Sequence, residues 1–174
     1  MPGRRFHLLP IGPVEQNMTR VPAGPLTLGV EYRVFNDDTS WDWFGRGDQP
    51  PEALEQVKAQ QEELGGFDDE GVSVHVFETE TGDEMLRFDC FREDPHYHYI
   101  SNAGPYVDMI HFDPVVTGEM LPWVLDQLAL NLPNMLSEVG KADLAPQVDE
   151  QAWADALLQV RELATRARRP ATAG

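Results

Sequence analysis

Three short turn sequences divide residues 71–112 into four segments that alternate in polarity and are too short for typical helices. The turns are residues 81–84, 93–95 and 101–105, which contain glycine, proline or both. Side chains along a strand point alternately to opposite faces, so alternation bounded by such turns is typical of strands joined as hairpins. We therefore predict a four-stranded antiparallel meander over residues 71–112.

The segments around this meander complete the expected fold. Residues 26–35 alternate in the same way and predict a fifth, half-buried strand. Pro50 and Pro51 open a helix that Gly65 and Gly66 should stop after about residue 64. The last third has helical apolar spacing, in segments that begin near residues 118, 133 and 149. We predict an α+β fold: an antiparallel meander sheet of about five strands packed on one face by C-terminal helices.

The length of 174 residues suits a single domain. Residues 1–25 contain five prolines with little periodicity, and predict an extended or disordered N-terminal arm. The single α+β domain should span residues 26–168, followed by a disordered tail over residues 169–174. Within it, residues 36–49 are expected to form an irregular loop.

Charge and composition exclude several classes of function. Acidic residues number 30 against 13 basic ones, a formal net charge of −17 that repels phosphate backbones and disfavours nucleic-acid binding. One cysteine excludes an internal disulfide framework, and no apolar run approaches the length of a membrane span. We expect a cytoplasmic protein whose partner is a protein or a small molecule, with neither nucleic acid nor membrane involved.

A two-residue turn at Gly82 and Asp83 would set the register of the first hairpin. His75 would then face Cys90, and Glu78 would face Arg87 as an opposite-charge pair. A histidine beside a cysteine invites a thiolate–imidazolium interpretation. Free cysteine is, however, among the most buried residue types, so core packing is the favoured role for Cys90.

His96 and His98 are the strongest candidate site residues, because their spacing puts both rings on one face of a strand. The turn at residues 94–95 would place Asp89 opposite His98. The next hairpin adds either His111 or Asp108, depending on its register. Imidazole and carboxylate groups together are zinc or iron ligands, so a divalent metal site is one expectation. A proton relay is another, and ordinary strand histidines bonded to carboxylates are a third.

Trp41 and Trp43 lie in the glycine-containing segment before the first helix. Tryptophan is enriched where proteins bind partners, so both are candidate ligand-binding residues together with Asp89. The alternative is that this segment folds its aromatic rings onto the sheet.

The run Leu86-Arg87-Phe88-Asp89-Cys90-Phe91, followed by Asp94-Pro95-His96-Tyr97-His98-Tyr99, resembles a bacterial domain family of unknown function. In that family an aromatic-Asp-Cys-Phe strand leads into Pro-His-Tyr-His-Tyr, and a helical C-terminal half follows. The resemblance covers about residues 70–165. It implies a small bacterial cytosolic domain and carries no activity with it.

Three functional hypotheses follow. The first is a non-enzymatic protein that binds a partner or ligand through the sheet face around His96 and His98. The second is a metal-dependent hydrolase or oxygenase that uses His96 and His98 with His111, Asp89 or Asp108. The third is an assembly module that responds to pH through its histidines.

Overall fold

The structure is a computed structural model that describes residues 5–8, 11–47, 49–50, 52–101 and 107–168, with the backbone alone for residues 5–8. The predicted tail over residues 169–174 lies outside this range.

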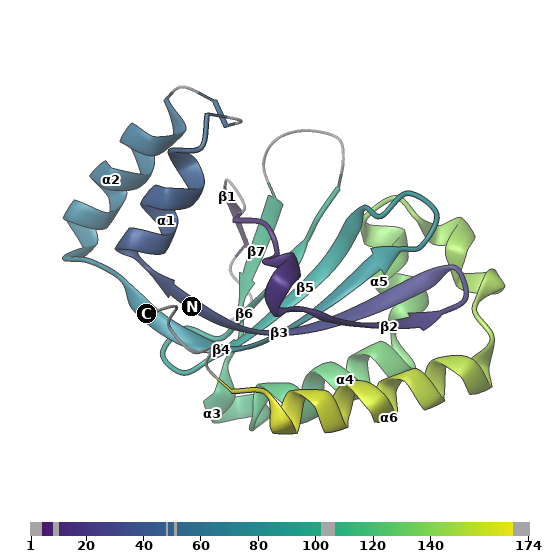
Figure 1. The fold of residues 1–174 in the computed structure, drawn as a ribbon. Coiled ribbons are helices and arrows are strands. Elements are labelled where there is room, and N and C mark those ends of the chain that lie inside the picture. Colours follow the sequence, from purple (N-terminus) through teal and green to yellow (C-terminus); the bar gives the residue numbers. More distant parts are fainter. Residues whose placement is uncertain (1–4, 9–10, 48, 51, 102–106, 169–174) are drawn as a thin grey trace.

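One seven-stranded antiparallel sheet organises the described chain, in the order β1-β7-β6-β5-β4-β3-β2 (Figure 1). Neighbours in sequence are neighbours in the sheet from β2 to β7, so the predicted meander is confirmed, and β1 pairs with β7 at the far edge. The strands are β1 (Arg5–Leu8), β2 (Thr19–Ala23), β3 (Leu26–Asn36), β4 (Asp68–Glu78), β5 (Glu84–Phe91), β6 (His96–Tyr99) and β7 (Val107–His111).

The sheet has more strands than the five predicted, because residues 5–8 and 19–23 of the expected arm belong to it. Thr19 to Ala23 pair with β3 through a tight turn at Gly24, whose φ is 66°. Pro22 lies on this edge strand, where a missing backbone N–H costs no ladder hydrogen bond.

Six α-helices accompany the sheet in the described residues. They are α1 (Asp37–Phe44), α2 (Ala53–Leu64), α3 (Pro114–Thr117), α4 (Met120–Leu130), α5 (Leu132–Glu138) and α6 (Glu150–Arg166), with 3₁₀ turns η1 (Glu15–Asn17) and η2 (Ala142–Gln147). None of these helices has the length and apolar composition that crossing a membrane requires. The predicted helix end at Gly65 is confirmed, and α6 begins where the last helical segment was predicted, with Asp149 as its N-cap.

The prediction of an irregular loop over residues 36–49 is wrong, because α1 occupies most of it. Asn36 accepts a hydrogen bond from the backbone N–H of Thr39, and the Thr39 hydroxyl accepts one from the backbone N–H of Asn36. This reciprocal pair is a capping box, which satisfies two N–H groups at the helix start and makes so short a helix favourable.

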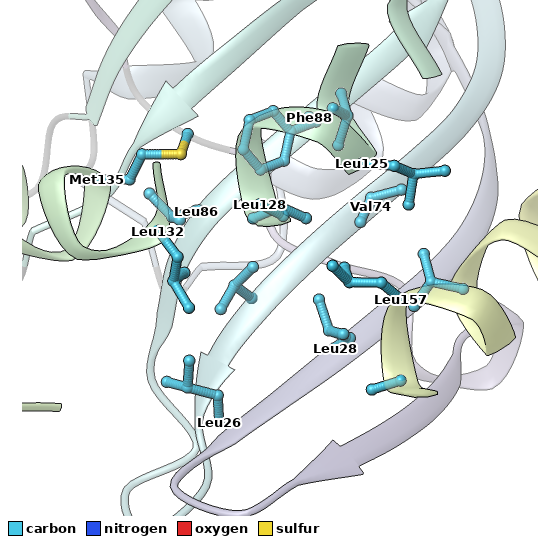
Figure 2. Packing of buried hydrophobic residues seen from close by; sticks show 14 of the residues in the cluster. Leu26, Leu28, Val74, Leu86, Phe88, Leu125, Leu128, Leu132, Met135 and Leu157 are labelled. Atoms are coloured by element: carbon cyan, nitrogen blue, oxygen red, sulfur yellow. The ribbon is translucent and has the colours of Figure 1, made fainter. Parts of the chain in front are cut away.

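The apolar face of the sheet packs against α4, α5 and α6, which confirms the predicted fold class. Its centre is fully buried and consists of Leu26, Leu28, Val74, Val76, Leu86 and Phe88, with Leu128, Leu136 and Val160 from the helices (Figure 2). Burying one such side chain contributes about 1.5–3 kcal/mol. Tyr97 and Tyr99 of β6 also pack on this core, as their alternation with the histidines predicts.

The register predicted for the first hairpin is wrong. His75 faces Arg87 and not Cys90, and Ser73 faces Asp89. The turn is longer than two residues, because β4 ends at Glu78 and β5 begins at Glu84, and the pairing slips once more between Val76 and Phe77. The shift is odd, so it exchanges the faces of one strand relative to the other.

The observed pairing therefore puts the valines of β4 on the core face with Cys90. The polar residues gather on the opposite face, which lies on the side of the sheet where α1 and α2 stand (Figure 1). The expected Glu78–Arg87 pair is not formed; Glu78 bonds Lys141 and Arg87 bonds Glu84.

Candidate functional site

The polar face of the sheet carries a continuous row of buried ionisable side chains. They are contributed by β3 to β6 and comprise Glu31, Arg33, His75, Arg87, Asp89, His96 and His98. Residues that face each other on neighbouring strands point to the same side, so the register alone brings them together. Burial of so many charges is costly unless each is paired.

Asp89, His96 and His98 form the tightest part of this row. Asp89 lies directly opposite His96, and the strand alternation brings His98 to the same face. One ligand atom from each residue lies within 4.8 Å of the others. The Asp89 carboxylate was predicted to face His98; the observed partner is two residues earlier, and an even shift keeps the predicted face.

The spacing of these atoms suits a small cation. Asp89 Oδ2 lies 3.3 Å from Nε2 of His96 and 3.3 Å from Nε2 of His98. A zinc ion bound tetrahedrally at about 2.0–2.1 Å holds its ligand atoms roughly 3.3 Å apart. Two histidines and one carboxylate are also the ligand set of non-haem iron sites. These three residues could hold zinc or iron.

Two contacts orient the set. The Ser73 hydroxyl donates to Asp89 Oδ1, and His96 Nδ1 lies 2.7 Å from the carbonyl oxygen of Asp94. A carbonyl only accepts, so His96 carries a proton on Nδ1. In the neutral ring, the lone pair of Nε2 would then face the Asp89 carboxylate. Two acceptors at this distance repel each other unless a proton or a metal ion lies between them.

The three pKa values reflect this arrangement. Burial opposes the charged form of Asp89, but His96 and His98 outweigh it and hold the carboxyl pKa well below its usual range. Burial also disfavours a charged His96, yet Asp89 and the Asp94 carbonyl raise the pKa of this ring. At His98 burial prevails and lowers the pKa to about 4. Near neutrality Asp89 is thus a carboxylate and His98 a neutral ring, whereas His96 holds a proton more strongly than a free imidazole does.

His111 lies on the same face, opposite His96, whereas Asp108 lies on the other face, opposite Tyr99. The register therefore settles which of the two joins the histidine pair on the sheet. His111 Nδ1 lies 2.7 Å from Asp94 Oδ1, and His111 is outside the three-residue group. Its predicted role as a metal ligand stays a prediction.

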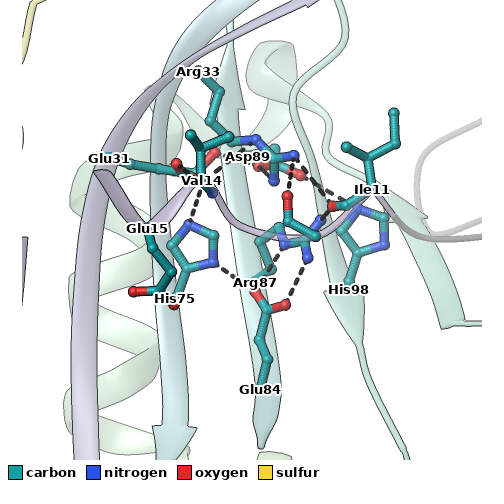
Figure 3. Close-up of polar contacts among 12 residues, drawn as sticks. Ile11, Val14, Glu15, Glu31, Arg33, His75, Glu84, Arg87, Asp89 and His98 are labelled. Carbon is teal, nitrogen blue, oxygen red and sulfur yellow. Dashed lines mark hydrogen bonds and ion pairs between the residues drawn. The ribbon is translucent and has the colours of Figure 1, made fainter. Parts of the chain in front are cut away.

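A second cluster lies beside the first and is centred on His75, which is fully buried. Its ring nitrogens lie 2.5 Å from Glu84 and 3.1 Å from Glu31 (Figure 3). Glu84 also accepts from Arg87, at 2.8 Å to Nε and 2.6 Å to Nη2. Sequence reasoning missed this cluster; the available signal was the alternation that puts Glu31 and Arg33 on one face of β3, and Arg87 and Asp89 on one face of β5.

Residues 11–14, which we call the strap, cross over this cluster (Figure 3). The Ile11 carbonyl accepts hydrogen bonds from Arg33 and Arg87, and the backbone N–H of Val14 donates to Glu31. A β-carbon at Gly12 would come within 2.5 Å of the Trp43 ring, so only glycine fits beneath that ring without a shift.

A cavity of about 560 Å³ opens between the polar face, the strap and the helices α1 and α2. Asp89, His96, His98 and His111 all line it, together with both arginines. Its walls are largely apolar and include Phe35, Phe44, Val57, Phe67 and Phe91. The predicted site residues of β5 to β7 thus share one cavity.

The two tryptophans lie beside this cavity. Helix α1 contributes Ser40 and Phe44 to the lining, whereas neither Trp41 nor Trp43 belongs to the described lining residues. The Trp41 indole donates to Gln61 Oε1 at 2.6 Å, which joins α1 to α2. Their predicted contact with a ligand stays a prediction. Cys90, the alternative catalytic candidate, packs at the core, where burial raises its pKa to about 12.

The fold and site define an α+β domain whose buried polar sheet face forms the floor of a cavity. The chain belongs to a family described as a domain of unknown function (DUF7700), whose model matches residues 20–164. The expected membership of a domain family of unknown function is confirmed. No curated protein and no solved structure matches the chain.

Proposed function

We propose that this chain is a small-molecule-binding protein whose ligand occupies the cavity between the polar sheet face and helices α1 and α2. The observation that supports this proposal most directly is the cavity, which has a volume of about 560 Å³, apolar walls and a polar floor. Small-molecule sites are concave, mostly apolar and roughly 300–1,000 Å³ in volume, with a few polar groups that fix orientation.

Unsatisfied polar groups around the cavity support the proposal. Three lining side chains, Arg33, Ser40 and His98, each have a buried atom with no hydrogen-bond partner among the described residues: Nη1, Oγ and Nδ1 respectively. A buried polar group without a partner costs about 1–3 kcal/mol, so a ligand that reaches these groups would recover part of that energy.

The proposed setting is the cytoplasm of a bacterium. Cys90 is a free cysteine, as a reducing compartment permits, and the family resemblance suggests a bacterial origin. The acidic net charge of −17 argues for a small-molecule or protein partner and against a nucleic acid.

Binding of the neutral dye N-phenyl-1-naphthylamine tests this function, since its fluorescence rises in an apolar cavity. We expect saturable binding of one dye per chain. Val57 lines the cavity, so Val57→Trp should fill it and weaken binding by about tenfold or more, a loss of roughly 1.4 kcal/mol.

Val116 is exposed on α3, outside the lining, so Val116→Trp is the matched control and should bind like the wild type. Absence of saturable binding to the wild type, or unchanged binding to Val57→Trp, would reject the proposal.

A second candidate function is a metal-dependent hydrolase or oxygenase. It is favoured by the convergence of Asp89, His96 and His98 at the floor of a cavity that could admit a substrate. Zinc would activate a water molecule for hydrolysis, and iron would support oxidation.

Metal content tests this candidate. Protein purified without chelator should contain about one zinc or iron ion per chain, and Asp89→Asn or His98→Ala should lose it. His111→Ala reports whether His111 is a ligand, because loss of metal in that variant would add it to the set. Metal-free protein whose thermal stability does not change on adding zinc or ferrous iron would rule the candidate out.

A further inference from the structure

Two buried arginines line the cavity, and their surroundings differ. Arg87 donates from Nε and Nη2 to both oxygens of Glu84, and from Nη1 to the Ile11 carbonyl. Every nitrogen of this guanidinium therefore has a partner. The forked contact with one carboxylate is the strongest arrangement available to arginine.

Arg33 has no such carboxylate. Its Nη2 donates to the Ile11 and Gly12 carbonyls, at 3.2 Å each. Its Nε lies 3.4 Å from Glu31 Oε1, and its Nη1 lies 3.9 Å from Asp89 Oδ1, which is too long for a hydrogen bond. Within the described part of the chain, Nη1 has no hydrogen-bond partner.

The neighbouring carboxylates also contact other groups. Glu84 is bound by Arg87 and His75, whereas Glu31 accepts the Val14 N–H at Oε2 and its Oε1 lies 3.1 Å from His75 Nε2. Asp89 accepts from Ser73 and contacts both histidines. Burial, together with repulsion from Arg87, lowers the pKa of Arg33 despite these carboxylates. Arg33 thus has two carboxylates at ion-pair distance and, unlike Arg87, a hydrogen bond to neither.

We infer that the ligand of this cavity carries an anionic group, a carboxylate or one of like charge and shape, and that Arg33 binds it. The inference rests on the proposed function, because it needs a cavity that takes a ligand. The apolar body of the ligand lies against the phenylalanine-rich wall formed with α1 and α2. A guanidinium matches a carboxylate geometrically and remains charged at any physiological pH.

Three probes with the same ten-carbon chain test the inference: decanoate, decanol and decylamine. Each is titrated against protein loaded with N-phenyl-1-naphthylamine, at pH 7 in the presence of EDTA. A hydrogen bond between charged groups is stronger than one between neutral groups, so decanoate should bind at least about tenfold more tightly than decanol. Decylamine should bind most weakly.

Substitution of Arg33 assigns the effect to this residue. In Arg33→Met the ratio of the affinities for decanoate and decanol should fall to about one. Arg33→Lys keeps the positive charge and should retain part of the preference for decanoate. Arg92 is an exposed arginine paired with Glu70, so Arg92→Met removes the same charge elsewhere and should keep the wild-type ratio. If Arg33→Met does not fold, comparing the decanoate-to-decanol affinity ratio of Arg33→Lys with that of the wild type still tests the role of Arg33.

The outcomes separate the two proposals. Equal binding of decanoate and decanol, with the dye still bound, overturns the anionic ligand and leaves the cavity function intact. If the dye does not bind, both the cavity function and the anionic ligand are overturned. A preference for decanoate that appears only when zinc replaces EDTA assigns the anion to a metal ion and overturns the role of Arg33.

Discussion

At the level of single residues, Asp89 of β5 connects the side chains of the two neighbouring strands. It accepts from Ser73 of β4 and contacts His96 and His98 of β6, while itself standing on β5. A fully buried carboxylate is costly, so the fold depends on these partners to keep it ionised. The site is consequently sensitive to changes that do not touch the cavity.

Ser73→Ala should destabilise the protein because it removes the hydroxyl that donates to Asp89 Oδ1. Leaving a buried charged acceptor with one donor fewer costs about 1–3 kcal/mol in the free energy of unfolding, measured by urea denaturation. Ser137→Ala, on the exposed surface of α5, is the control and should change it by less than about 0.5 kcal/mol. Equal effects of the two variants would contradict this role of Ser73.

The protonation of His75 should make stability depend on pH. Burial alone would lower the pKa of His75, but Glu84 and Glu31 raise it above its usual value of 6.5. A raised folded-state pKa stabilises the fold at pH values below 6.5, and this contribution is lost as the pH rises through the folded-state pKa. In His75→Gln the decrease in the free energy of unfolding between neutral and alkaline pH should be smaller, as measured by urea denaturation at each pH. A variant with the wild-type slope would show that His75 does not titrate in this way.

At the level of elements, the pairing of β4 with β5 depends on Gly71. A β-carbon at this position would collide with the backbone carbonyl of Cys90 on the neighbouring strand. Gly71→Ala should therefore push the strands apart and cost about 1–3 kcal/mol in the free energy of unfolding. Asp68→Ala, at the exposed start of β4, is the control in the same thermal or urea measurement. Equal stability of both variants would mean that the strands can shift without loss.

From β3 onward, most of the element order could be predicted from sequence because alternation and glycine stops are local signals, whereas β1, β2 and α1 were missed. The hairpin registers could not. In the second hairpin, the carboxylate of buried Asp69 accepts from the backbone N–H groups of Arg92, Glu93 and Asp94, and so fixes a longer turn. This anchor comes from another strand, which no local pattern indicates.

The two register errors had different consequences. The pairing of Asp89 differs by two positions from the predicted one, so its predicted face survived and the site was found. The pairing of His75 differs by three positions, so the predicted contact with Cys90 was wrong and the Glu31–His75–Glu84 cluster was missed. The cavity was beyond prediction too, because it depends on where α1, α2 and the strap pack.

At the level of the whole molecule, charge is unevenly divided between interior and surface. The formal net charge is −17, and among the described residues only four of the 30 acidic side chains are buried, Glu31, Asp69, Glu78 and Asp89, together with Arg33 and Arg87. The surface is therefore rich in carboxylates that repel one another. Such self-repulsion destabilises a compact state, and salt screens it.

Raising sodium chloride from about 10 to 300 mM should increase the melting temperature by a few degrees, since the Debye length falls from roughly 30 Å to below 10 Å. The buried pairs are screened much less and should contribute little to this change. Sodium chloride is suitable because it has weak specific effects on hydration. A melting temperature that falls with salt would mean that exposed ion pairs outweigh the net repulsion.

The strap has a consequence for the order of folding. Ile11 bonds Arg87 and β1 pairs with β7, whereas the contacts of the meander join consecutive strands. Closing a longer stretch of chain costs more conformational entropy, so we expect β2 to β7 to assemble first and the N-terminal residues to dock last. During refolding both guanidinium groups would then stay hydrated until that final step, when the Ile11 carbonyl replaces water as their hydrogen-bond partner.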